Sequence, residues 1–105
     1  MNNRKQALID LRDKVKEGEY TTTFEYEAAL GEWQKAHNAR HGYLDAAKAL
    51  HEAVLPKKMC LAGLHQFRGK WGVRLIPGNI MVNDDNPARA WLLAILEALI
   101  AQEGE

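Results

Sequence analysis

The chain has 105 residues, of which 47% are hydrophobic and 27% charged, as is ordinary for a globular protein. This length suits a single domain over 1–105, with frayed ends expected at 1–3 and 102–105. A domain of this size has no room for a deep, fully enclosed active site beside its core. The formal net charge is zero, which argues against an extended nucleic-acid interface. An enzyme is therefore the least expected class, and nucleic acid an unexpected partner.

The cysteine content and the apolar runs favour the cytoplasm. Cys60 is the only cysteine, so no intrachain disulfide can form and an oxidising compartment is not indicated. Charged residues interrupt the first apolar residues, and the longest apolar run, 90–96, is far shorter than a membrane span. Neither a signal peptide nor a transmembrane helix is expected.

Three helices are predicted before any strand. Apolar residues recur at three- and four-residue spacing over 4–16, which predicts the first helix. The second helix should run over 24–41 with its cap among the threonines at 21–23, and Gly31 should weaken it mid-course. The third helix is predicted over 43–55.

The periodicity then becomes that of strands. Two runs, 59–67 and 70–76, flank the dipeptide 68–69, which predicts a tight antiparallel hairpin. Alternation in the second run indicates a half-buried strand, with Arg74 pointing away from the apolar face. A short third strand is expected at 80–82.

The last helix, 88–101, is apolar nearly all round. Asn86 can cap it, and Pro87 fits its first position. Since Leu93 and Ile100 lie off the main apolar face, the helix is either covered on several sides in a three-layer arrangement or sits in a homo-oligomer interface. The predicted order is ααα-βββ-α, an α+β fold with an antiparallel hairpin or meander.

Four segments of the chain have recognisable sequence patterns. They are 8–19 with its Leu-x-x-Leu start, 43–56 (YLDAAKALHEAVLP), 71–73 (WGV) and 86–94 (NPARAWLLA). Together they resemble a known family of small phage and prophage proteins, the phage ABA sandwich domain. The segments occur in the same order as in that family and cover nearly the whole chain.

The resemblance implies a helix/sheet/helix sandwich and an origin in a virus or integrated prophage, hence the cytoplasm of an infected or lysogenic bacterium. Many relatives have Gly-Trp after the Leu-Pro pair, where this chain has Lys57, Lys58 and Met59. Either the aromatic anchor near the first strand is missing here, or Trp33 replaces it. The family is named for its architecture, so the resemblance implies neither a function nor catalytic residues.

Two histidines have a spacing that could place both on one metal ion. His37 and His41 lie at positions i and i+4 of a predicted helix, although the Glu that a zinc-protease motif requires after the first His is replaced by Asn38. His51 or Glu52 could approach as a third ligand. Two solvated histidines near a helix end are the favoured interpretation, so no metal or cofactor is expected.

Two further pairs of residues are candidates for catalysis. Cys60 and His65 could form a nucleophile and base, but their spacing places them on opposite faces of one strand. Asp84 and Asp85 precede a helix, where negative charge is favourable without any chemistry. No catalytic site is predicted.

The basic residues gather in the middle of the chain. Residues 56–83 hold five basic residues and no acid, whereas 84–105 hold one basic and five acidic residues. The five are Lys57, Lys58, Arg68, Lys70 and Arg74. With Tyr43 and Trp71 as stacking residues, they are candidates for binding a nucleotide.

The predicted strand separates these cations. Lys57 and Lys58 would lie roughly 30 Å from Arg68 and Lys70 across an extended strand, so one pocket within a protomer is not expected. Two smaller sites within one protomer and a single site shared across a dimer are the two alternatives. A solvated edge strand, protected from aggregation by its charges, is the favoured interpretation.

Two functions compete. The first is a non-catalytic phage accessory protein that binds a host or phage protein, with Trp33, Leu93 and Ile100 as candidate interface residues. Trp71 and Trp91 are instead expected in the core. The alternative is a counter-defence protein that sequesters a nucleotide signalling molecule at the basic hairpin.

Overall fold

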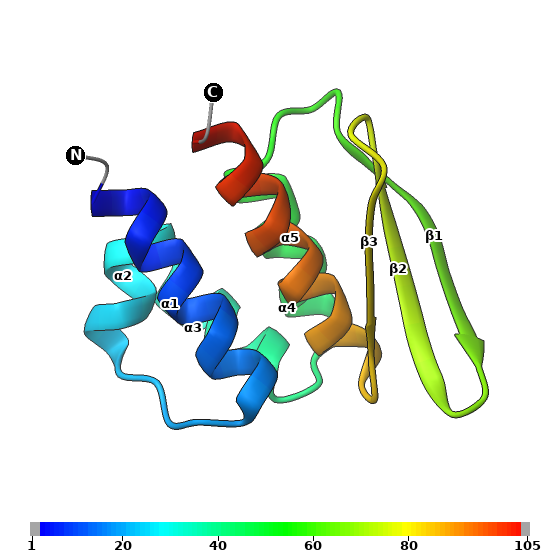
Figure 1. The fold of residues 1–105 in the computed structure, drawn as a ribbon, viewed down its shortest axis with the longest axis horizontal. Helices are drawn as coiled ribbons and strands as arrows, with labels where there is room; N and C mark the ends of the chain where they lie inside the picture. Colours follow the sequence, from blue (N-terminus) through cyan, green and yellow to red (C-terminus); the bar gives the residue numbers. More distant parts are fainter. Residues whose placement is uncertain (1–2, 104–105) are drawn as a thin grey trace.

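A computed structural model describes residues 3–103 and shows an α+β protein with five helices and one three-stranded antiparallel sheet. Helices come before and after the sheet in the chain, as expected (Figure 1). The elements are α1 (Asn3–Glu17), α2 (Thr23–Leu30), α3 (Trp33–Arg40), α4 (Leu44–Val54), β1 (Cys60–Phe67), β2 (Lys70–Ile76), β3 (Ile80–Asp84) and α5 (Pro87–Glu103).

The predicted second helix is in fact two helices, α2 and α3. Thr22 caps α2 in a capping box, in which its side chain accepts the Glu25 N–H and the Glu25 carboxylate accepts the Thr22 N–H. Gly31 then adopts a φ of 72°, and its N–H donates to the Glu27 carbonyl. A left-handed residue of this kind ends a helix instead of weakening it, so the prediction of one continuous helix was wrong.

The outer ends of α1 and α5 are helical further than expected. Asn3 begins α1 and Glu103 ends α5, so residues 3 and 102–103, for which fraying is predicted, are helical in this structure. The two helix ends contact each other, and Arg4 Nη1 lies 3.0 Å from Glu103 Oε1. The other residues expected to fray, 1–2 and 104–105, lie outside the described residues.

The sheet is a meander in the order β1-β2-β3. Arg68 and Gly69 both have positive φ, 54° and 80°, which is the backbone of a two-residue hairpin turn. Val73 and Leu75 of β2 are buried, whereas Arg74 between them is exposed, as predicted. One face of the sheet therefore points into the protein, and the other, here called the outward face, points to solvent.

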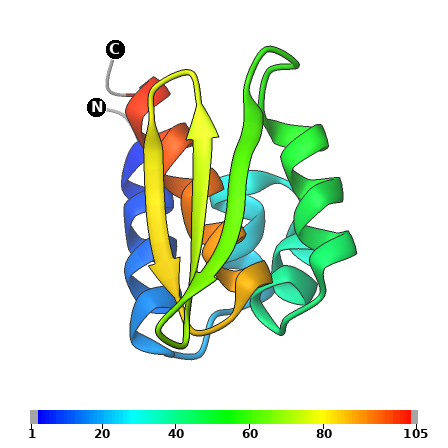
Figure 2. The same ribbon diagram turned by 90° about the vertical axis from the view of Figure 1, so that its right-hand side faces the viewer.

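Helix α5 lies at the centre of the molecule. The sheet packs on one side of it, and α1, α3 and α4 pack on the other sides (Figures 1 and 2). Leu93 is 1% exposed inside this packing, and Ile100 is half-buried against the same core. Their proposed role in an oligomer interface is therefore corrected for Leu93, because neighbouring helices of the same protomer already cover it. The three-layer alternative accounts for the apolar helix.

One charge of α5 sits within this packing. Glu97 is half-buried and faces α1, where its carboxylate lies 2.6 Å from Arg12 Nη1. The hydrogen bond from Arg12 to Glu97 raises the pKa of the Arg12 guanidinium, which therefore stays charged. A paired charge is thus accommodated between α1 and α5.

Replacing Leu93 with Ala tests the central position of α5. Removal of a fully buried leucine should lower the free energy of unfolding by about 3 kcal/mol, and Ile100→Ala, at a half-buried position, should cost less. Urea unfolding at protein concentrations spanning about two orders of magnitude provides the measurement. A midpoint that rises with concentration would place α5 in an oligomer interface instead.

Candidate functional site

The outward face of the sheet carries exposed apolar side chains. No helix in residues 3–103 covers this face, which looks toward the viewer in Figure 2. Phe67 pairs with Lys70 in register, and Met81 pairs with Arg74, so both point outward. Phe67 is 68% exposed, Met81 64% and Ile76 38%. One residue from each strand thus presents apolar surface to solvent.

Cations surround this apolar surface. Arg68 lies over the Phe67 ring, 5.2 Å from its centroid. Lys70 Nζ lies 2.5 Å from Asp85 Oδ1, a contact that raises the pKa of Lys70 and lowers the pKa of Asp85. Arg74 is exposed and, among the described residues, has no acidic partner. The outward face is therefore basic, with Arg68 and Arg74 free of carboxylates.

A pocket of about 430 Å³ opens beside the hairpin turn on this face. It is lined by His65, Gln66, Phe67, Arg68, Lys70, Gly72 and Asn83. A Cβ on Gly72 would lie 3.0 Å from Asn83 Oδ1 and 3.1 Å from His65 Nε2. The absence of a side chain at position 72 therefore lets these two polar side chains lie over the middle strand.

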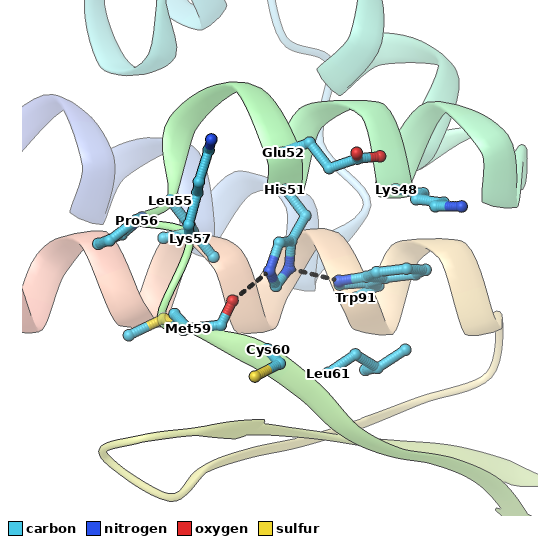
Figure 3. Close-up of a pocket in the computed structure, with 10 residues that line it drawn as sticks. All are labelled: Lys48, His51, Glu52, Leu55, Pro56, Lys57, Met59, Cys60, Leu61 and Trp91. Carbon is cyan, nitrogen blue, oxygen red and sulfur yellow. Dashed lines mark hydrogen bonds between the residues drawn. The ribbon is translucent and has the colours of Figure 1, made fainter.

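A second hollow, of about 590 Å³, lies between α4 and the start of β1, with Trp91 of α5 at its floor (Figure 3). We call it the α4–β1 groove. It is lined by Lys48, His51, Glu52, Leu55, Pro56, Lys57, Met59, Cys60, Leu61 and Trp91. The groove forms because α5 packs closely against β2 and β3, whereas no helix packs as closely against β1.

His51 connects the three parts of the chain that form the groove: α4, the start of β1 and α5. Its Nδ1 accepts the indole N–H of Trp91 at 3.1 Å, and its Nε2 lies 2.9 Å from the Met59 carbonyl oxygen (Figure 3). A carbonyl can only accept, so Nε2 carries the proton and the ring is neutral in this arrangement. Both nitrogens are used, and a metal ligand at His51 would have to break one of these bonds.

The structure separates most of the predicted ligand residues. Of the seven predicted ligand residues, only Arg68 and Lys70 line the same pocket. Trp71 points inward, because it precedes Gly72 and shares the face of Val73. Tyr43 is 64% exposed at the start of α4.

The remaining predicted ligand residues lie elsewhere in the fold. Lys57 and Lys58 precede β1, at the end of that strand away from the hairpin turn. A single pocket built from all five basic residues is thus absent from the described chain, in line with the expectation from strand length.

The predicted tryptophan environments agree with the structure in part. Trp91 is 8% exposed and belongs to the core, as expected, whereas Trp71 is only half-buried. Trp33 is 39% exposed at the start of α3, which leaves its interface role as a prediction.

The candidate chemical pairs do not form sites. His37 and His41 lie close, with ring centroids 4.5 Å apart, but no three His, Cys, Asp or Glu side chains gather in the described part of the chain. Asp84 accepts the Asn86 N–H and pairs with Arg89 at 2.6 Å, so it holds the start of α5.

The face assignment of Cys60 and His65 was wrong. A bulge between Leu61 and Gly63 adds one residue to β1, and Cys60 and His65 both point outward, opposite Ile76 and Gly72. They remain roughly 13 Å apart along the strand, too far for proton transfer.

Sequence reasoning missed the α4–β1 groove. No spacing rule brings His51, Met59 and Trp91 together, because their meeting depends on how α4 and β1 diverge over α5. Compared with known proteins, the chain matches no family model, no curated protein and no solved structure. Among residues 3–103, no helix has the length and apolar character needed to cross a membrane.

Trp91→Phe tests the hydrogen bond to His51. The variant leaves Nδ1 as a buried acceptor without a donor, which should lower the free energy of unfolding by about 1–3 kcal/mol. Trp71→Phe, at a half-buried position of β2, is the control for loss of ring size and should cost less. Chemical denaturation gives both values.

A double-mutant cycle separates the hydrogen bond from packing. Trp91→Phe should lower the free energy of unfolding by less in a His51→Leu background, because no acceptor is left unpaired there. Equal costs in the two backgrounds would contradict the assignment.

Proposed function

We propose that this chain is a non-catalytic phage or prophage accessory protein that binds another protein through the outward face of its sheet. The observation that carries the proposal is the uncovered face itself, on which Phe67 and Met81 are largely exposed beside Arg74. Aromatic residues, Met and Arg are enriched at protein interfaces. The virus origin rests on the sequence resemblance alone.

The charge of this face selects the kind of partner. Arg68 and Arg74 lie on it and have no carboxylate partner among residues 3–103, so an acidic surface with an apolar centre is the complementary one. Self-association across a two-fold axis would bring the same cations of two copies together, which is unfavourable. The proposed partner is therefore a different, acidic protein and not a second copy.

Site-specific photo-crosslinking in a bacterial lysate tests this proposal. A photoreactive residue at Met81 should give an adduct that Arg74→Glu abolishes. The same residue at Phe24 is the matched control, because Phe24 is 85% exposed on α2, far from the sheet (Figure 1). Raising the salt to about 0.5 M should weaken the adduct, since it shortens the Debye length.

Three results would contradict the proposed contact. They are identical adducts from Met81 and Phe24, an adduct that persists in Arg74→Glu, and the absence of any adduct at Met81. An adduct whose mass is twice that of the chain would identify a homo-oligomer instead.

The hairpin pocket favours a second candidate function, sequestration of a nucleotide. Arg68 and Lys70 can contact phosphate there, and the exposed Phe67 ring can stack on a base. Against it, Lys70 is already paired with Asp85, and a phosphate would have to compete with that carboxylate.

A thermal-shift panel of cyclic and linear nucleotides tests this second function. Binding should raise the melting temperature of the wild type, and Arg68→Ala should remove the shift. Lys58→Ala, at the other end of β1, is the control and should retain it. The nucleotide function is excluded if no member of the panel shifts the wild type, or if Arg68→Ala shifts equally.

A further inference from the structure

One edge of the sheet lies beside the α4–β1 groove. Within residues 3–103, β1 pairs only with β2, so the N–H and C=O groups on its other edge have no strand partner there. The carbonyl of Met59, immediately before β1, points toward α4 and accepts from His51 (Figure 3). Backbone groups alternate in direction along a strand, so Leu61 presents its N–H and C=O on the same side as Met59.

The floor of the groove suits apolar side chains. Trp91 and His51 use their ring N–H and N groups on each other and on Met59, so the floor offers no unmet donor or acceptor. Leu55, Met59 and Leu61 contribute apolar surface to the walls. The groove volume, about 590 Å³, lies within the usual range of ligand pockets.

The rim of the groove is weakly basic. Lys48 and Lys57 are both exposed, and Glu52 is the one acid among the lining residues. Neither lysine has an acidic partner in the part of the chain that the structure describes. An acidic group on the occupant would be complementary to this rim.

From these three features we propose that the α4–β1 groove binds an extended acidic peptide segment, which adds to β1 as a fourth strand. Main-chain hydrogen bonds to Leu61 would hold the segment, an apolar side chain would lie over Trp91, and an acidic residue would face Lys57. A second copy is a poor occupant, because α4 flanks β1 in each copy and two such helices would meet.

This site is separate from the outward face, so the two proposals can fail independently. Met81→Glu should leave peptide binding unchanged, and Lys57→Glu should leave the Met81 crosslink unchanged.

A displayed library of random peptides of about eight residues, the length of a typical strand, is the probe. Selection on the wild-type protein should enrich sequences with a bulky apolar residue and at least one Asp or Glu. Fluorescence anisotropy with an enriched peptide then gives the Kd. Lys57→Glu should raise that Kd by about fivefold.

Lys58→Glu is the matched control, because Lys58 is the exposed neighbour of Lys57 but does not line the groove. It should change the Kd by less than about twofold. Methylating alternate backbone nitrogens of the peptide should abolish binding if strand addition holds it, and the Leu61 amide signal should shift in the complex.

Several results would overturn the proposal. No enrichment, equal binding by the N-methylated peptide, or amide shifts confined to the outward face would each reject strand addition at this groove. Binding of decanoate with the same Lys57 dependence, without any peptide binding, would identify a site for small amphipathic anions instead.

Discussion

Coverage of α5 on nearly all sides is the constraint on which the rest of this fold depends. Ten of its residues are buried, and they lie all around the helix. Four of them are alanines, which allow close approach of neighbouring elements: Ala88, Ala90, Ala94 and Ala98. The sheet supplies one wall around α5, and α1, α3 and α4 supply the others. All five helices of residues 3–103 lie on one side of the sheet, so none of them covers the outward face.

The position of the helices on one side of the sheet explains why both candidate binding regions involve the sheet. The outward face is open because the helices lie behind it, and the α4–β1 groove is open because α5 lies under β2 and β3 more closely than under β1. The outward face combines apolar and cationic side chains, whereas the groove combines a satisfied polar floor with an unpaired strand edge. The partners that we propose for the two regions differ accordingly: a folded acidic surface for the outward face and an extended segment for the groove.

Most local features of the structure could be predicted from the sequence. Periodicity identified the helices and strands, Asn86 accepts the Arg89 N–H as a cap should, and the Arg68–Gly69 turn was found from its type. The break at Gly31 was missed because a helical glycine and a left-handed one look alike in sequence. The bulge in β1 and the meeting of His51 with Trp91 depend on contacts between distant elements, which no spacing reveals.

The attachment of β1 has a consequence for the dynamics of the sheet. β2 is held between two strands and against α5, whereas β1, within residues 3–103, has one strand neighbour and packs less closely against the helices. Free energies of local opening follow such differences in contact. We therefore expect amide hydrogens of β1 to exchange with solvent through openings that leave β2 and β3 intact, which would make this strand a separate, weaker cooperative unit at one margin of the protein.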